Sequence, residues 1–319
     1  MKKDSASKSK ADIARPNQEA LDQLVVRAKQ THTDAMIMVQ NGETLGEWDF
    51  GKEKRLIETM SMTKSIVSLA IGTLLTEKKI DSIDDPIWFY FPEWRQGNKE
   101  KITLRHILNH TSGLQDDPTT EVIYRSPDFL KLALAAELNS TPGERWFYSN
   151  KACNILPGII ERASGQKIDD YLRMTLFAAL EIEDFAWTKD SAGNPHGFAG
   201  LSLTAKDLSK IGQLMLLNGK WKGEQVIDAS FVQESTKPAH QNCGLLWWTD
   251  YWGKDHDSAE QTETASVMGF SARGYLGQYL IVLPKQKLVV VRQITAASYK
   301  TEVDNFHEFD KLVAALFPK

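Results

Sequence analysis

The sequence has 319 residues, of which 42% are hydrophobic and 25% charged, and its formal net charge is -4. A chain of this size buries about three quarters of its unfolded surface, so a large core is expected. The net charge gives no field strong enough to gather nucleic acid or an anionic membrane, which excludes both as expected partners.

The start of the chain contains no apolar stretch of the length that a secretory signal needs, and no later run is long enough to span a membrane. We therefore expect no membrane span and, for the sequence as written, a cytoplasmic location. A periplasmic or secreted location applies if an export signal has been removed. The polar, basic residues at the start predict a disordered lead-in over residues 1–16.

The elements predicted first are a helix and a hairpin. Apolar residues at helical spacing predict a helix over residues 17–31, which would pack on a sheet. Two strand-like runs follow, 35–39 and 44–50. Between them lies Asn41-Gly42, the dipeptide best suited to a tight hairpin turn.

The middle of the chain has a helical pattern. Residues from Met60 to about Lys78 are apolar on nearly every side, which predicts a buried helix. The pattern stays mostly helical to about Ser235, and Thr204 with Asp207 is typical of a capping box at the start of one helix. We find no internal repeat and no long low-complexity linker.

Strand signals return near the end, at 276–283 and 288–294, on either side of a turn at 284–286. A last helix is expected over 301–316. Strands at both ends of the chain and helices between them predict one sheet built from the two termini. The helical middle would be an insertion against this sheet, with a cleft where the two meet.

The expected fold class is therefore α/β of the α+β type, with an antiparallel sheet flanked by helices. We expect residues 17–319 to form a single domain. Its sheet subdomain would comprise about 17–60 and 236–319, and its helical subdomain about 61–235.

A serine and a lysine at the start of the buried helix are the first candidates for chemistry. Ser61 and Lys64, in the sequence S-M-T-K, share one helix face and lie within hydrogen-bond reach. A neighbouring amine activates a serine when burial and positive charge lower the amine's pKa. The same spacing occurs at Ser5, Ser7 and Ser164, but only Ser61 opens an apolar helix. The alternative is an ordinary serine with a solvated lysine one turn later.

The segment Tyr148-Ser149-Asn150 is the only Y-x-N sequence in the chain. It follows residues 141–144, a turn that would hold it on a loop at the cleft. A tyrosine near a lysinium can protonate a leaving group and later activate water, and Asn150 would hold a substrate carbonyl. The alternative is a buried aromatic whose hydroxyl is satisfied by the backbone.

These segments resemble those of the class C serine β-lactamases, the DD-peptidases, and their esterase and nylon-oligomer-hydrolase relatives. The resemblance covers about residues 17 to 317. It includes residues 61–65 (SMTKS), 104–114 (LRHILNHTSGL), 142–150 (PGERWFYSN) and 200–208 (GLSLTAKDL). It implies a β-lactamase/transpeptidase-like catalytic domain with Ser61 as nucleophile, Lys64 as its proton acceptor and Tyr148 as a second acid/base.

The family's third element, a strand carrying K-T-G or H-x-G, resembles Ala272-Arg273-Gly274 here. Gly274 would keep the backbone close to the substrate, and the amides of Tyr275 and Ser61 would form an oxyanion hole. Ala272 occupies the cationic position, and strand alternation puts Arg273 on the opposite face. Penicillin-recognising members use a lysine there near the substrate carboxylate, so the resemblance to esterases and nylon-oligomer amidases is closer.

Four aromatic residues just before this element have two interpretations. Trp247, Trp248, Tyr251 and Trp252 would either wall an apolar substrate pocket, with Trp248 as the candidate binding residue, or pack in the core. The polar stretch 250–264 predicts a mobile loop at the cleft mouth.

Two histidines and two cysteines are expected to be structural. His106 and His110 are spaced like a metal pair, but there is no H-E-x-x-H and no evident third ligand, so we expect no metal and no cofactor. Cys153 and Cys243 are expected to be half-buried free thiols, with a single bridge between them as the alternative.

The leading hypothesis is a serine hydrolase that cleaves a small-molecule ester or amide by two-step acyl transfer through Ser61. A β-lactamase or DD-peptidase acting on a β-lactam or peptide is the runner-up. A non-catalytic penicillin-binding-like sensor or scaffold is a second class, and self-assembly into a structural polymer a third. The sequence indicates no oligomeric state.

Overall fold

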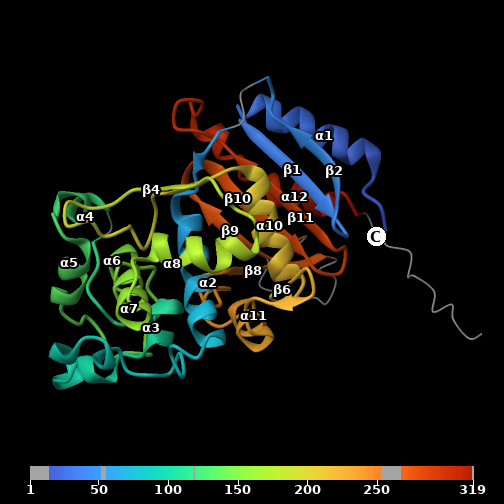
Figure 1. Cartoon of the computed structure of the whole chain (residues 1–319). Helices are drawn as coiled ribbons and strands as arrows, with labels where there is room; N and C mark the ends of the chain where they lie inside the picture. Colours follow the sequence, from blue (N-terminus) through green and yellow to red (C-terminus); the bar gives the residue numbers. More distant parts are fainter. Residues whose placement is uncertain (1–13, 52–54, 118, 253–266, 318–319) are drawn as a thin grey trace, which may run out of the picture.

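A sheet and a helical region make up the part of the chain that the computed structural model describes, residues 14–51, 55–117, 119–252 and 267–317. Figure 1 shows that both ends of the chain, blue and red, build the sheet, while the middle, green to yellow, builds most of the helical region beside it. The predicted α/β fold of the α+β type, with its helical middle, is therefore confirmed.

The main sheet has six strands, each antiparallel to its neighbours, in the order β2-β1-β11-β10-β9-β8. The strands are β1 (Ala35–Gln40), β2 (Glu43–Trp48), β8 (Trp248–Trp252), β9 (Val267–Gly274), β10 (Gln278–Leu283) and β11 (Leu288–Gln293). The pairing of β1 with β11 joins the two ends of the chain, with Ile37 opposite Val291. The sheet therefore forms only when residues far apart in sequence meet, which carries a loop-closure entropy cost.

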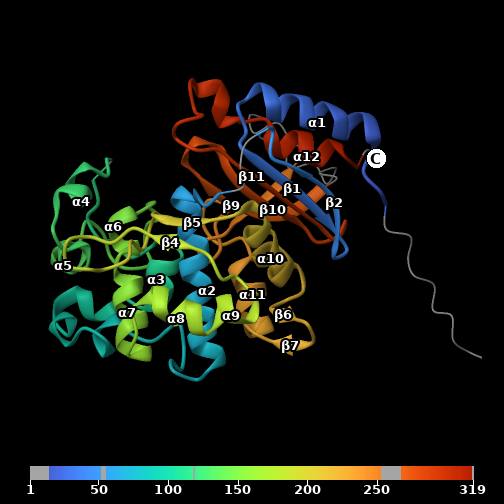
Figure 2. The ribbon, with the colours of Figure 1, turned by 45° about the horizontal axis from the view of Figure 1, so that its top comes forward.

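Helices cover both faces of this sheet. Figure 2 shows α1 (Gln18–Gln30) and α12 (Phe309–Ala315) on one face and α10 (Ala205–Leu216) on the other. The α10 helix comes close to the sheet at Gly212, where a Cβ atom would lie 2.5 Å from Val289 Cγ1. A larger residue at this position would push the helix outward.

The alternation of side chains along β11 supplies both cores. Leu288 and Val290 pack in one cluster with Leu24 of α1, whereas Val289 and Val291 belong to the larger cluster on the other face. Successive residues of a strand point to opposite faces, so a continuous apolar strand fits a sheet that is covered on both sides.

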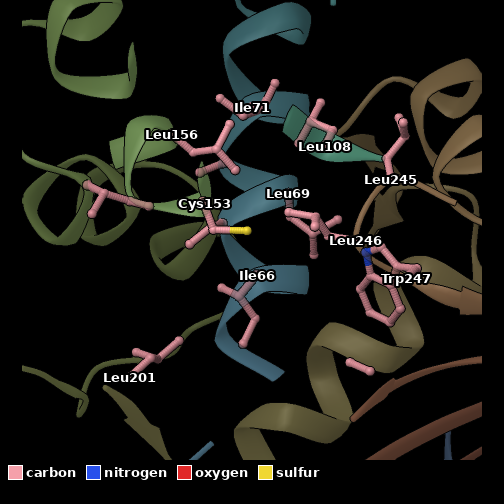
Figure 3. Close-up of a cluster of buried hydrophobic side chains, with 14 of the residues drawn as sticks. Ile66, Leu69, Ile71, Leu108, Cys153, Leu156, Leu201, Leu245, Leu246 and Trp247 are labelled. Carbon is pink, nitrogen blue, oxygen red and sulfur yellow. The ribbon is translucent and has the colours of Figure 1, made fainter. Parts of the chain in front are cut away.

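The helical region is arranged around α2 (Thr63–Thr76), in which Ile66, Leu69, Ala70 and Leu74 are completely buried. Figure 3 shows side chains from other segments around this helix, among them Leu108, Cys153, Leu156, Leu201, Leu246 and Trp247. A helix that is apolar on every side is stable only when it is enclosed in this way.

The other helices of this region are short. They are α3 (Leu104–Leu108), α4 (Glu121–Arg125), α5 (Phe129–Ala135), α6 (Asn150–Cys153), α7 (Ile155–Ser164), α8 (Ile168–Met174), α9 (Leu176–Ala179) and α11 (Ala229–Ser235). The 3-10 turns are η1 (Met60–Met62), η2 (Ile87–Phe89), η3 (Pro92–Trp94), η4 (Gly97–Lys101), η5 (Tyr275–Gly277) and η6 (Glu302–Asn305). None of the helices in the described ranges is both long and apolar enough to cross a membrane.

Small strands also occur in the middle of the chain, where the sequence pattern is mostly helical and predicts no strand. They are β3 (Ile57–Glu58), β4 (Ala186–Trp187) and β5 (Leu201–Leu203), which form a sheet in the order β3-β5-β4, and the pair β6 (Lys220–Trp221) and β7 (Glu224–Gln225). Strands of two or three residues carry too little periodicity to be recognised in a sequence.

The first helix, the hairpin and the buried helix after Met60 lie where the sequence predicts them. Thr204 caps α10 as predicted, since its hydroxyl accepts from the Asp207 amide (3.1 Å). The capping box itself is only half formed, because the Asp207 carboxylate accepts from the Thr204 hydroxyl (2.7 Å) rather than from the Thr204 amide.

Two predictions near the C-terminus are wrong in their bounds. The strand predicted from residue 276 begins at Gln278, because Leu276 has a φ of 65°, outside the range of a strand. The last helix, predicted as one element, is divided: η6 ends at Asn305, the next residue Phe306 has a φ of 52°, and α12 begins at Phe309.

Some expectations stay predictions. Residues 1–13 of the predicted lead-in and 253–264 of the predicted loop lie outside the described residues. The predicted start of that loop is wrong, because residues 250–252 belong to strand β8. The assignment of residues 17–319 to one catalytic domain, and its division into subdomains, is likewise a prediction.

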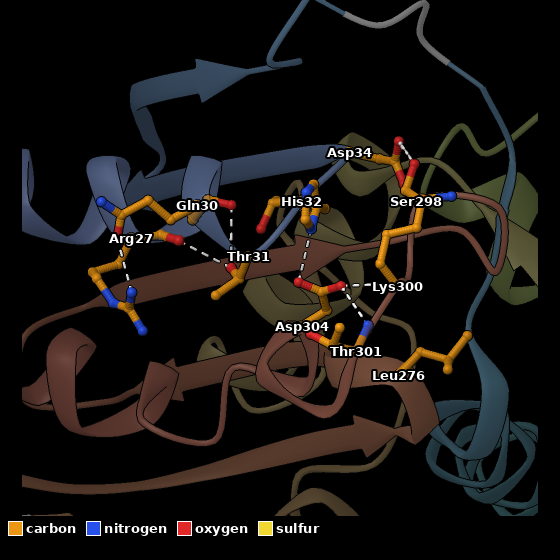
Figure 4. Close-up of polar contacts among 12 residues, drawn as sticks. Arg27, Gln30, Thr31, His32, Asp34, Leu276, Ser298, Lys300, Thr301 and Asp304 are labelled. Carbon is orange, nitrogen blue, oxygen red and sulfur yellow. Dashed lines mark hydrogen bonds and ion pairs between the residues drawn. The ribbon is translucent and has the colours of Figure 1, made fainter.

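Polar contacts fix the start of β1 against the segment that follows β11 (Figure 4). Asp304 accepts from the Lys300 amide (2.7 Å) and pairs with His32 Nδ1 (2.8 Å). Asp34 accepts from the Ser298 hydroxyl (2.8 Å). Both carboxylates are almost fully buried, so their hydrogen bonds replace the water that they have lost.

Arg292 of β11 extends this junction to the turn after β9. Its fully buried guanidinium donates to the carbonyl oxygens of Thr31 (2.8 Å), Asp304 (2.9 Å), Gly277 (2.6 Å) and Leu276 (3.3 Å). Burial lowers the pKa of Arg292 to about 10, so the group stays protonated at neutral pH. One cation therefore holds the end of α1 and the η5 turn together.

We expect Arg292→Lys to lower the free energy of unfolding by about 3 kcal/mol, because an ammonium group cannot reach all of these carbonyls and leaves buried acceptors unpaired. Urea denaturation measures the change. The control is Arg27→Lys, the same replacement at a partly exposed ion pair with Glu308, where a change below about 1 kcal/mol is expected. Equal losses in the two variants would contradict the prediction.

Candidate active site

Ser61 lies in η1, the turn that joins β3 to α2. Thr59 leads into this turn, and its amide and hydroxyl both bond to the carbonyl of Leu201 in β5 (2.8 and 2.9 Å). Met60 has a φ of 51°, which is uncommon for a residue with a side chain. As one of the first N–H groups of a helical segment, the Ser61 amide has no partner within the helix, and its predicted role in an oxyanion hole stays a prediction.

Lys64 lies one turn after Ser61 and is only 2% exposed. Its Nζ donates to Ser61 Oγ (3.1 Å) and to the carbonyl oxygen of Phe198 (3.1 Å). It also lies 4.7 Å from the ring centroid of Tyr148 and 5.4 Å from that of Phe198. The serine and lysine predicted to act together are thus within the distance over which a proton is transferred.

Tyr148 meets Lys64 with the face of its ring. The ring stacks on Trp248, with centroids 6.2 Å apart, and lies 4.7 Å from the His110 ring. Within the described residues, the Tyr148 hydroxyl forms no hydrogen bond with Ser61 or Lys64. Catalytic hydrogen bonds in a site without substrate are often long, so this geometry is compatible with the predicted acid/base role but does not test it.

A pocket opens in front of these side chains and encloses about 220 Å³ of empty space, part of it open to solvent. Its lining residues are Ser61, Lys64, Ser65, His110, Tyr148, Cys243, Leu246 and Trp248. Trp248 therefore borders the pocket, whereas Trp247 is fully buried in the core. The substrate-binding role of Trp248 stays a prediction. The side chains of Tyr251 and Trp252 lie outside the described residues.

The end of β9 lies against the turn that holds Ser61. A Cβ atom at Gly274 would be only 2.3 Å from the Thr59 carbonyl oxygen, so this approach requires glycine. Tyr275 follows at once, with a side chain that is 68% exposed. Neither residue lines the pocket among the residues described. Their contribution to an oxyanion hole stays a prediction.

The two faces of β9 differ in charge. Ala272 is fully buried in the core that faces α2. Arg273 points to the other face, where its Nη2 pairs with Asp310 of α12 (3.3 Å). The predicted opposite orientation of these side chains is confirmed. Among the described residues that line the pocket, Lys64 is the only lysine or arginine.

Asn150 is the first residue of α6 and does not line the pocket. Its Oδ1 is buried and has no hydrogen-bond partner within the described residues. The predicted contact of Asn150 with a substrate carbonyl is not tested by this geometry. Its neighbour Ser149 caps the helix by accepting from the Ala152 amide (2.9 Å).

The two histidines accept backbone hydrogen bonds. His106 Nδ1 accepts from the Thr103 amide (3.2 Å), and His110 Nδ1 accepts from the Ser149 amide (3.3 Å). No three His, Cys, Asp or Glu side chains gather at a metal-binding distance in the part of the chain that is described. Unlike His106, His110 contributes directly to the pocket wall.

Both cysteines are free and almost fully buried, so the expectation of half-buried thiols underestimates their burial. Burial raises the pKa of the Cys153 thiol to about 12, which keeps it protonated. Cys243 lines the pocket.

A family model described as Beta-lactamase matches residues 19–311, which is most of the chain. The chain belongs to this family. Ser61, Lys64 and Tyr148 line one pocket of this chain. Curated relatives carry the names of a hydrolase and of a penicillin-binding protein.

Two curated relatives and one solved structure illustrate the range of the family. A 6-aminohexanoate-dimer hydrolase of Paenarthrobacter ureafaciens is 26% identical over 67% of this chain and 59% of its own length. Penicillin-binding protein 4* of Bacillus subtilis is 30% identical over 47% of this chain and 36% of its own length. The chain thus spans less than two thirds of either protein. The structure of a putative 6-aminohexanoate-dimer hydrolase from Bacillus anthracis matches with a TM-score of 0.75 and 19% identity, covering 92% of this chain and 81% of that one.

Three polar groups that form hydrogen bonds around the candidate active site were not predicted from the sequence. The carbonyl of Phe198 receives the Lys64 hydrogen bond, and the Ser65 hydroxyl donates to the carbonyl of Leu246 at the pocket wall (2.6 Å). Asp116 bonds to the segment after Tyr148. Backbone carbonyls leave no mark in a sequence, but Asp116 closely follows the H-T-S-G sequence that carries the resemblance and could have been considered.

The buried imidazole of His110 makes stability depend on pH. Burial first, and then the charge of Lys64, lowers the pKa of His110 to about 3, whereas an imidazole in an unfolded chain titrates near ~6.5. Between these values the unfolded state binds one more proton than the folded state. Stability therefore falls as the pH decreases below ~6.5 and goes on falling towards about 3.

We expect the wild-type protein to lose about 2 kcal/mol more unfolding free energy than His110→Asn when the pH is lowered from ~7.5 to ~5. Asparagine keeps an acceptor two bonds from Cβ and does not titrate. Urea denaturation at the two pH values gives the difference, in which the titration of the other histidines cancels. A pH dependence that is the same in both proteins would show that His110 is not the group responsible.

Proposed function

We propose that this chain is a serine hydrolase that cleaves an ester or amide through an acyl-enzyme on Ser61. The observation that carries the proposal is the 3.1 Å contact between Lys64 Nζ and Ser61 Oγ at the base of a pocket that also borders Tyr148. A hydroxyl, a buried amine and a phenol in one pocket are the groups that acyl transfer requires.

The reaction takes two steps. With Lys64 as a neutral amine, Ser61 Oγ attacks the substrate carbonyl while its proton moves to the Lys64 nitrogen, and the amides of Ser61 and Tyr275 stabilise the oxyanion. Lys64 and Tyr148 pass the proton to the leaving group as its bond to the carbonyl carbon breaks. Water then attacks the acyl-enzyme by the same proton path in reverse and frees the acid and Ser61.

The chemistry of the pocket favours an ester or amide without a carboxylate over a β-lactam. The cationic position of the family's third element holds Ala272, and Arg273 is paired with Asp310 on the far face of the sheet. A relative with the printed name Esterase EstB of Burkholderia gladioli, 28% identical over 41% of this chain, supports this order. A β-lactamase or DD-peptidase is the second candidate, because a penicillin-binding protein is also among the relatives.

We expect Ser61→Ala to abolish covalent labelling by a fluorophosphonate, since the reagent bonds to the activated serine oxygen. Mass spectrometry of the intact protein gives the labelled fraction. The control is Ser164→Ala, a serine with the same S-x-x-K spacing whose hydroxyl bonds to the Ile160 carbonyl (2.6 Å), and its labelling should equal that of the wild type. Full labelling of the Ser61 variant would refute the assignment.

We expect measurable turnover of p-nitrophenyl butanoate and little or none of nitrocefin, because Lys64 is the only lysine or arginine among the described residues that line the pocket and is engaged with Ser61, which leaves none of them for the β-lactam carboxylate. Absorbance assays of both substrates with wild type and Ser61→Ala compare the two activities. Rapid nitrocefin hydrolysis without esterase activity would reverse the order of the two candidates. One equivalent of acylation without release would instead favour a ligand sensor.

A further inference from the structure

We propose that Asp116 and His110 are positioning residues that hold Tyr148 against Lys64 by fixing the backbone on both sides of the tyrosine. The inference rests on the proposed function of Tyr148 as the acid that protonates the leaving group. It adds two residues, outside the three that react, whose hydrogen bonds determine where the phenol lies.

His110 holds the peptide groups on either side of Tyr148. The amide of Phe147 donates to the His110 carbonyl oxygen (2.9 Å), and the amide of Ser149 donates to His110 Nδ1 (3.3 Å). The His110 ring also packs on the tyrosine ring at 4.7 Å. A neutral imidazole offers one acceptor nitrogen, so the second bond requires the proton to be on Nε2.

Asp116 holds the residues that follow Tyr148. Its Oδ2 accepts from the Ser149 hydroxyl (2.6 Å) and from the Lys151 amide (2.9 Å). Its Oδ1 accepts from the Asp117 amide (2.8 Å). A carboxylate can accept all three bonds, whereas an amide side chain would present a donor to at least one of these donors.

The segment that carries both residues is itself fixed to the chain before Tyr148. The Gly143 amide donates to the Thr111 carbonyl (2.8 Å), and the Asn139 amide donates to that of Gly113 (2.8 Å). Gly113 has a φ of 73°, and a Cβ there would lie 2.3 Å from the Ser140 carbonyl oxygen. Residues 110–116 therefore form a rigid support along which the Tyr148 segment is aligned, and Tyr148 needs no hydrogen bond of its own hydroxyl to be placed.

Displacement of the Tyr148 phenol would slow protonation of the leaving group more than it slows the other steps of the reaction. Breaking the bond to a basic alkoxide requires a proton, which comes from Ser61 by way of Lys64 and Tyr148, whereas p-nitrophenolate departs without one. The loss of activity caused by a displaced Tyr148 should therefore depend on the leaving group. A general loss of folded protein should instead lower the activity with both esters equally.

The test compares kcat/KM for ethyl butanoate and p-nitrophenyl butanoate, which share an acyl group and differ in the basicity of the leaving group. For Asp116→Asn we expect a loss of ~100-fold with the ethyl ester and of less than ~5-fold with the nitrophenyl ester, since a displacement of about 1 Å costs ~100-fold. Ser149→Ala removes one bond to Asp116 and keeps the carboxylate, so it should show the same selectivity with a smaller loss. Ser149→Ala can also replace Asp116→Asn in this test if the latter variant does not fold.

Asp117→Asn is the matched control. Asp117 is the neighbouring carboxylate, but its Oδ1 bonds to Thr119 (3.0 Å) and not to the Tyr148 segment. Both ester activities should stay at the wild-type level. In a Tyr148→Phe background, Asp116→Asn should change the ratio of the two activities no further, because the phenol that it positions is gone.

The outcomes separate this inference from the proposed function. Equal losses for the two esters in both Asp116→Asn and Ser149→Ala, with Ser61→Ala inactive, would overturn the positioning role alone. Hydrolysis that persists in Ser61→Ala would overturn the proposed function, and the positioning role with it.

Discussion

The buried amine of Lys64 is the group on which the arrangement of the site depends. Taking an amine out of water costs free energy unless it gains hydrogen bonds in return. Here the compensation comes from one hydroxyl, one backbone carbonyl and the faces of two aromatic rings, supplied by Ser61, Phe198 and Tyr148. These partners come from three distant parts of the sequence, so the amine is stable only in the complete fold.

The carbonyl of Phe198 illustrates how the rest of the chain supports this amine. The preceding amide, that of Gly197, donates to Asn154 Oδ1 (2.9 Å), which holds the segment against α6. A Cβ at Gly197 would lie 2.2 Å from the Cys153 carbonyl oxygen, so this close approach requires glycine. The helix that begins with Asn150 thus also positions the acceptor of the lysine, and the tyrosine and lysine sides of the pocket are joined through Asn154.

Side-chain positions that follow from the periodicity of a single helix or strand were predictable from the sequence. Contacts between different elements were not. Ser61 and Lys64 meet because residues three apart share a helix face, and Arg273 faces away from Ala272 because strands alternate. The Phe198 carbonyl and the Asp116 bonds depend on loops that meet only in the folded chain. The break in the last helix at Phe306 was not predictable from the sequence either, because a phenylalanine does not by itself favour the left-handed φ that it has there.

The register of β9 decides which charge the pocket receives. Ala272 pairs with Leu280 and Arg273 with Tyr279 of β10, and a shift of one residue would turn the arginine towards the face of the sheet that packs on α2. Gly274 opposes such a shift, because any side chain brought to its position would collide with the Thr59 carbonyl beside Ser61. The glycine that lets the strand approach Ser61 therefore also keeps Arg273 on the far face of the sheet, beside Asp310. Lys64 remains the one lysine or arginine among the described residues around the pocket.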